Sequence, residues 1–162
     1  MISQKFVDFV QGPTMHHVGS RNAKLRPAYS WAFGATVNAD EGTITFYLPN
    51  VEGAETLGNF EDNGMVAFTV GDPATNETYQ FKGPSLSIRP SEDKDTAIQD
   101  IHRSKLISHL APLGYPDAIL TGFTIYPSTA VTFKVEDVFV QTPGPGAGNK
   151  LDLESSEPVG GT

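Results

Sequence analysis

Short stretches in which apolar and polar residues alternate recur along most of the chain and predict a protein built mainly of β-strands. Successive side chains of a strand point to opposite faces, so alternation marks a strand with one buried face. The strands predicted in this way cover residues 14–20, 26–34, 43–48, 65–71, 78–89 and 131–141. Residues 121–126 are also expected to be extended.

Polar turn residues separate these stretches. Residues 22–24 and 40–42 have the Asn, Asp and Gly composition of tight turns. In the last predicted strand, the alternation of residues 131–135 resumes out of phase after Glu136 and Asp137. A β-bulge produces such a shift, so we expect one near this pair.

Two short helices are predicted near the ends of strands. Residues 2–11 can form a helix that turns Phe6, Val7 and Val10 inward. A second short helix is expected between Asn50, a suitable N-cap, and Gly64, a suitable C-cap. Its inward face would consist of Ala54, Leu57 and Phe60.

The longest predicted helix begins after Ser91, a suitable N-cap, and carries Glu92 and Asp93 where the helix dipole favours anions. Pro112 and Gly114 are expected to end it. The residues assigned to its buried face are Ala97, Ile98 and Ile101, continued by Leu106, Ile107 and Leu110.

Short strands with few helices imply a mainly β protein, a closed or partly closed antiparallel barrel. The chain of 162 residues fits one domain. We assign residues 1–151 to this barrel and expect the polar, Gly-containing tail, 152–162, to be disordered.

Composition narrows the classes of function. The formal net charge of −8 argues against sequence-independent binding of nucleic acid phosphates. The absence of cysteine excludes disulfides and thiolate metal sites. The first ten residues have neither a basic region nor a long apolar run, so no signal peptide is predicted and a cytoplasmic location is expected.

The order of the segments between Thr14 and Gly83 carries a resemblance to a known family. TMHHVGS is followed by RPAYSWAFG, ITFYLP, a short helix ending FEDNG, then MVAFTV and TYQFKG. This order and spacing resemble the pyridoxamine 5'-phosphate oxidase-like family of FMN-binding split barrels. The resemblance implies a split barrel, a homodimer with FMN at the subunit interface, and a flavin-dependent oxidoreductase of unknown substrate.

The resemblance also implies which residues bind the FMN phosphate. Arg26 stands where the family has an arginine that begins the second strand. Tyr47 and Leu48 stand where it has an aromatic residue and a threonine, so the hydroxyl is lost at Leu48. Glu55 and Thr56 stand where it has a basic pair, and neither is basic. Two cations just before Arg26, Arg21 and Lys24, could supply the missing charge.

At the flavin ring, the family's glutamine falls on Thr78, with Gln80 two residues on and on the same strand face. The alternating aromatic residues Tyr29, Trp31 and Phe33 could form a wall for a planar ring, or belong to the core or a dimer interface. The only tryptophan is Trp31, so the C-terminal tryptophan-and-arginine signature of the true oxidases is missing. Pyridoxamine 5'-phosphate oxidase activity itself is therefore not expected.

Three other features leave alternatives open. His16 and His17 point to opposite faces of a strand, so they cannot both bind one metal, and no metal site is expected. Either could bind haem, as histidines of related split barrels do. A cofactor-free binding or regulatory barrel that has lost the phosphate clamp is the rival. The Gly-rich segment TPGPGAG, residues 142–148, lacks the Lys of a P-loop. It is either a mobile loop or a turn that closes over the site of the partner subunit, in which case Gln141 and Thr142 would be polar contacts.

Overall fold

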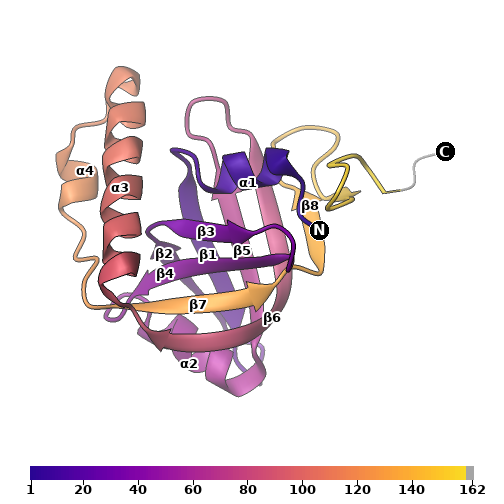
Figure 1. The fold of residues 1–162 in the computed structure, drawn as a ribbon, viewed down its shortest axis with the longest axis horizontal. Coiled ribbons are helices and arrows are strands. Elements are labelled where there is room, and N and C mark those ends of the chain that lie inside the picture. Colours follow the sequence, from indigo (N-terminus) through magenta and orange to yellow (C-terminus); the bar gives the residue numbers. More distant parts are fainter. Residues whose placement is uncertain (160–162) are drawn as a thin grey trace.

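The computed structural model describes residues 1–159 and consists of one curled, nine-stranded antiparallel sheet with helices at its rim (Figure 1). The strands are β1 (Met15–Arg21), β2 (Pro27–Ala32), β3 (Ala35–Asn38), β4 (Thr43–Pro49), β5 (Met65–Gly71), β6 (Thr78–Pro90), β7 (Ser128–Lys134), β8 (Asp137–Val140) and β9 (Lys150–Leu151). The helices are α1 (Gln4–Val10), α2 (Ala54–Asn63), α3 (Asp93–Leu110), the 3₁₀ turn η1 (Ala111–Leu113) and α4 (Ala118–Thr121).

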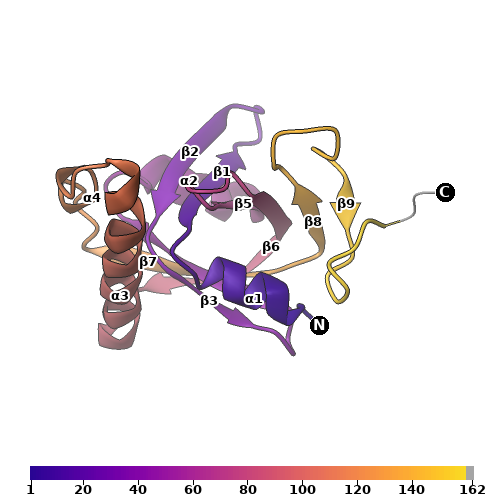
Figure 2. The same cartoon turned by 90° about the horizontal axis from the view of Figure 1, so that it is seen from above.

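The sheet runs in the order β2-β1-β5-β6-β7-β4-β3, with β8 paired to β6 and β9 paired to β8. Figure 2 shows how the strands curl around a common interior, with α1 lying across one opening. A backbone hydrogen bond of 3.0 Å from the Phe33 amide to the Tyr47 carbonyl links the end of β2 to β4. The mainly β, antiparallel barrel architecture predicted from the sequence is confirmed.

Strand β6 belongs to both halves of the barrel. Its first part pairs with β5 and β8, and its second part, from Ser85 onward, pairs with β7 with a register shift between Ser85 and Ser87. The chain crosses β6 at Gly83, where an added Cβ would lie 1.9 Å from the Lys134 carbonyl oxygen. The crossing lies between β7 and β8, at residues 135 and 136, so the predicted irregularity is a full break at which the chain changes its strand partners.

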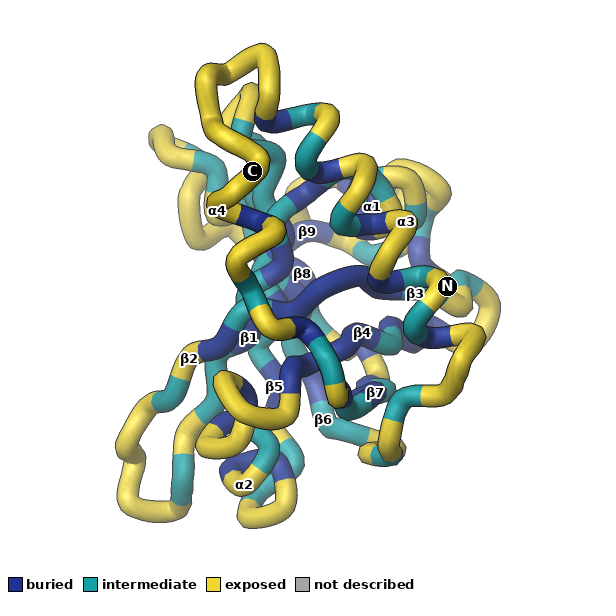
Figure 3. The backbone as a smooth tube through the Cα atoms, turned by 90° about the vertical axis from the view of Figure 1, so that its left-hand side faces the viewer, coloured by how far each residue is buried: buried dark blue, intermediate teal, exposed yellow. Residues whose placement is uncertain are grey.

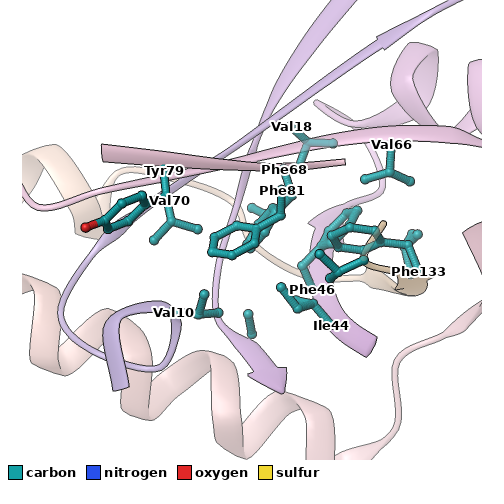
Figure 4. Packing of buried hydrophobic residues seen from close by; sticks show 14 of the residues in the cluster. Val10, Val18, Ile44, Phe46, Val66, Phe68, Val70, Tyr79, Phe81 and Phe133 are labelled. Atoms are coloured by element: carbon teal, nitrogen blue, oxygen red, sulfur yellow. The ribbon is translucent and has the colours of Figure 1, made fainter. Parts of the chain in front are cut away.

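Phenylalanines fill the barrel interior. Phe46 and Phe68 stack with ring centroids 5.0 Å apart, and Phe133 meets both rings edge-on (Figure 4). From α1, Phe6 packs edge-on against Phe81 with ring centroids 5.5 Å apart. The inward orientation predicted for Phe6 is confirmed, so α1 closes one end of the core.

The helix α3 differs from its prediction. Its N-cap is Glu92, which forms a capping box with Asp95, rather than Ser91. Ile101, predicted to be buried, is 57% exposed, and Ala97 is exposed. The first half of the helix instead turns the polar side chains of Asp95, Gln99 and His102 toward the barrel. The buried residues of its second half are Leu106 and Leu110.

Three smaller differences concern short segments. Residues 121–126, expected to be extended, follow the short helix α4 and contain no strand. Gly53 rather than Asn50 caps α2, because the Asn50 side chain instead accepts a hydrogen bond from Thr129. Strand β3 has no counterpart among the predicted strands.

The tail predicted to be disordered is placed against the barrel as far as residue 159. The Leu153 carbonyl accepts a hydrogen bond of 2.8 Å from the Ser3 amide, and Leu151 bridges to Pro158. Residues 160–162 lie outside the described residues. Among the helices of residues 1–159, none has the length and apolar character needed to cross a membrane.

Replacing Gly83 by alanine is expected to lower the free energy of unfolding by about 3 kcal/mol, because the new methyl group must displace backbone rather than a flexible side chain. Gly58, in α2, is the matched control, since a Cβ there meets nothing within 4 Å. Gly58→Ala should raise the free energy of unfolding by about 0.5–1 kcal/mol. Urea denaturation measures both, and equal effects would contradict the role of the crossing.

Candidate functional site

The outer face of the first half of the barrel carries some of the residues singled out from the sequence. In the pairing register, Tyr29 of β2, Gly19 of β1, Ala67 of β5 and Lys82 of β6 form one row across the strands. Their neighbours in sequence, such as Val18 and Phe68, point into the core. The row therefore faces away from the barrel interior.

A groove of about 440 Å³ lies over this face. Its floor contains small residues, Gly19, Ala28 and Ala67, which leave the backbone accessible to a flat ligand. Two cations, Arg21 and Lys82, stand at its edges. The residues that line it are Gly19, Ser20, Arg21, Pro27, Ala28, Met65, Val66, Ala67, Gln80 and Lys82.

Arg26 lies beside this groove, directly before β2. The turn that presents it is held by the Asn22 side chain, whose Oδ1 accepts hydrogen bonds from the backbone amides of Lys24 and Arg26. Arg26, Arg21 and Lys24 are all exposed on this hairpin, as its colouring in Figure 3 shows. A single turn thus concentrates three cations in a chain with a net charge of −8.

Gln80 and Thr78 lie on the same outer face of β6. The Gln80 side chain lines the groove and donates a hydrogen bond of 3.0 Å from Nε2 to Thr69 Oγ1. Thr78 lies beyond the groove, where its carbonyl accepts hydrogen bonds from the amides of Gln141 and Thr142. The start of the Gly-rich segment after β8 is therefore fastened to β6.

The remaining candidates for the phosphate site are not brought to the groove. Leu48 is fully buried in the core, and Thr56 is buried with a hydroxyl that has no hydrogen-bond partner within residues 1–159. Tyr47 turns toward α3, where burial and the neighbouring Asp95 carboxylate raise the pKa of Tyr47 to about 12. Glu55 is exposed in the first turn of α2.

The aromatic residues of β2 divide between two environments. Tyr29 is 57% exposed, Trp31 is half-buried, and Phe33 is 1% exposed. Tyr29 and Trp31 both contact His17, whose Nδ1 lies within hydrogen-bond distance of the Tyr29 hydroxyl. The aromatic wall considered from the sequence therefore includes Tyr29 and Trp31, while Phe33 continues inward.

His16 and His17 point to opposite faces of β1, as predicted. Burial lowers the pKa of His17, so its imidazole is neutral at neutral pH. His16 lies inside, where its Nε2 donates to the Val10 carbonyl at 3.0 Å. Within residues 1–159, no group of three or more His, Cys, Asp or Glu side chains is placed to hold a metal ion.

Sequence reasoning missed the partner of His16. The His16 ring stacks on the ring of His102 from α3 with centroids 4.3 Å apart, and His102 Nε2 donates to the Thr14 carbonyl at 2.8 Å. Burial lowers the pKa of both rings, most strongly that of His16, where the neighbouring His102 adds to the effect. This neutral pair ties α3 to the barrel, and only the folded arrangement brings its members together.

Comparisons with known proteins give similarity in structure alone. No protein-family model matches the sequence, and no curated protein matches it. The structure of HupZ from Group A Streptococcus superposes with a TM-score of 0.56 at 22% identity, and the match covers 91% of this chain and 100% of HupZ. A putative pyridoxamine 5'-phosphate oxidase from Lactobacillus delbrueckii gives 0.54 at 13% identity, covering 85% of this chain and 93% of that one. The chain therefore has the fold of the pyridoxamine 5'-phosphate oxidase-like split barrels, as expected.

The buried histidines should make stability depend on pH. Their pKa values are lowered in the folded protein, so the unfolded chain binds more protons below its own histidine pKa of about 6.5. The stabilisation is complete above that value and is lost as the pH falls. We expect the free energy of unfolding to drop by about 2 kcal/mol between pH 7.5 and 5.5.

His102→Gln tests this assignment, because glutamine keeps a donor for the Thr14 carbonyl and removes the titrating ring. The pH-dependent drop, measured by urea denaturation, should shrink in the variant to about half. The matched control is His109→Gln, which lies on the same helix and pairs with Asp72 near the surface. An unchanged drop in His102→Gln would exclude the stacked pair as its source.

Proposed function

We propose that the protein binds FMN over the outer face of β2, β1, β5 and β6 and acts as a flavin-dependent oxidoreductase. The observation that carries this proposal is the groove that combines Gly19, Ala28 and Ala67 with Arg21, Gln80 and Lys82, and that is lined by Pro27, the residue after Arg26. A flat, anionic ligand matches a flat floor with cations at its edge.

At the phosphate end, the hairpin cations Arg21, Lys24 and Arg26 replace the family's basic pair, because positions 55 and 56 carry Glu and Thr. Arg26 offers a planar fork of donors suited to a phosphate dianion, and Arg21 stands at the edge of the groove. Glu55, at the start of α2, adds a negative charge that a phosphate nearby would avoid. The phosphate is therefore assigned to the hairpin rather than to the helix.

At the ring end, Gln80 supplies a side-chain amide and Lys82 a positive charge. The Lys82 ammonium is held over the ring of Phe139, 4.8 Å from its centroid, which keeps this charge at the edge of the groove. When bound, the flavin supplies the electron-transfer chemistry. The residues of the chain orient it and balance its charge, so a nucleophile or a general base beside the groove is not required.

A homodimer completes the proposal. The groove is open on the side away from the barrel, and exposed apolar residues border it, including Tyr29 and Met65, which is 44% exposed. A second copy laid over this face would cover that apolar surface and enclose the ligand, as in ligand pockets at subunit junctions. Cytoplasmic residence is proposed with this function.

Arg26→Ala should weaken FMN binding by about 1.5–3 kcal/mol, the range for a hydrogen bond to a charged group. Glu55→Lys should leave the affinity unchanged or raise it, with greater sensitivity to salt. Quenching of flavin fluorescence on titration of the cofactor-free protein measures both. Arg103→Ala, on α3 and paired with Asp100, is the matched control and should leave the affinity unchanged.

Two results would count against the proposal. Wild-type affinity in Arg26→Ala would place the phosphate elsewhere. A protein that neither quenches FMN nor gains thermal stability at saturating FMN would favour a cofactor-free binding barrel. Light scattering on the same samples tests the dimer, and a monomer at micromolar concentration would remove the partner's half of the site.

One observation favours haem as a second candidate at the same face. His17 is the outward histidine of β1, it is neutral at neutral pH, and its Nδ1 contact with Tyr29 leaves Nε2 as the nitrogen available to an iron. His16 is excluded from this part in the folded protein, because its ring is buried against His102.

Titration with haemin separates the two candidates. If haem is the ligand, a Soret band should appear that His17→Ala removes and that His109→Gln leaves in place. Binding of FMN with no change in the haemin spectrum would exclude this candidate. A Soret band that survives in His17→Ala would show that another group binds the iron.

A further inference from the structure

We infer that an aromatic recess between β2, the end of β4 and the segment after α4 binds a small organic cation with an alkylammonium group. Tyr29, Trp31 and Phe33 of β2 form one side of the recess, and Phe123, which follows α4, forms the other. Figure 2 shows α4 packed beside α3, which positions this segment. The inference goes beyond the proposed FMN site and does not depend on it.

The aromatic rings are close enough to act together. The Phe123 centroid lies 5.3 Å from that of Trp31 and 5.4 Å from that of Phe33. Trp31 and Phe33 are nearly parallel, with an angle of 22° between their planes. The faces of aromatic rings attract cations, and Trp attracts them most strongly. Several rings around one recess form the arrangement that recognises methylated ammonium groups.

The charge of the recess matches the same ligand. Its lining residues are Tyr29, Ser30, Trp31, Phe33, Pro49, Glu52 and Phe123, of which only Glu52 is charged. Glu52 takes part in none of the ion pairs formed within residues 1–159. The Ser30 hydroxyl already donates to the Trp31 carbonyl at 3.1 Å. The Glu52 carboxylate is thus the charged group available to a ligand in the recess, and its negative charge favours a cationic ligand.

The size of the recess limits the ligand further. Its volume is about 110 Å³. At about 30 Å³ for each water in the liquid, this is room for roughly four non-hydrogen atoms, the size of a trimethylammonium group. A flavin ring does not fit in this space. The rest of a larger ligand would extend past Glu52, which is exposed, because the second copy proposed above would cover Tyr29, the other exposed member of the lining.

Calorimetric titration of the 162-residue protein with choline tests the inference, and the emission of Trp31, the only tryptophan in this sequence, gives a second readout. The comparison ligand is 3,3-dimethylbutan-1-ol, which has the shape of choline without its charge. Saturable binding of choline is expected, with the alcohol bound about tenfold more weakly or not at all. Phe123→Ala should reduce the difference between the two ligands, because it removes one of the rings that face the cation.

Glu52→Gln should weaken choline binding by about fivefold, the upper range for an exposed ion pair. The matched control is Glu61→Gln, an exposed acid on the outer side of α2, which should bind choline as the wild type does. Equal affinity for choline and the alcohol would overturn the inference in favour of an apolar recess. Absence of choline binding, or binding of inorganic phosphate that Glu52→Gln strengthens, would overturn it as well.

Discussion

The close crossing of the chain at Gly83 is the constraint on which the rest of this barrel depends. Strand β6 can serve both halves of the sheet only because residues 134–136 pass directly over it, and the Lys134 carbonyl occupies the space that any Cβ would need. The crossing also fixes where β7 ends and β8 begins, since the Glu136 amide donates to the Lys82 carbonyl at 2.9 Å. This hydrogen bond fixes the backbone of Lys82, which also lines the groove, so the crossing positions one edge of the groove.

The strands could be predicted because their chemistry is local. Alternating apolar residues must share one face, and burial of that face determines the register. The same rule put His16 and His17 on opposite faces of one strand, and Gln80 on the same face as Thr78. The face of the first half of α3 could not be read in this way, because it packs through hydrogen bonds rather than apolar contact: Asp95 pairs with Arg89 at 2.6 Å, and Gln99 Nε2 donates to Ser128 at 3.0 Å. Polar side chains with partners distant in the sequence look like a solvated face.

The candidate groove contains only some of the residues named from the sequence. Arg26 and Gln80 were named from the family resemblance; Gln80 lines the groove, and Arg26 directly precedes β2. The inward direction of Leu48 follows the alternation of Ile44, Phe46 and Leu48 along β4, whereas the burial of Thr56 depends on how α2 packs against β1 and β2, which residue spacing does not reveal. Phe123 belongs to a segment without regular alternation, and its place beside Trp31 follows only from the packing of α4.

Strand β2 separates two surfaces of opposite charge. Pro27 and Ala28 line the groove that contains Arg21 and Lys82, while Ser30 and Trp31 line the recess that contains Glu52. The cations and the acid come from different elements, Arg21 from β1, Lys82 from β6 and Glu52 from the turn before α2. A ligand spanning both surfaces would have to carry an anionic group at the hairpin end and a cationic group at the Phe123 end. Two separate ligands of opposite charge would instead be held side by side, each attracting the other.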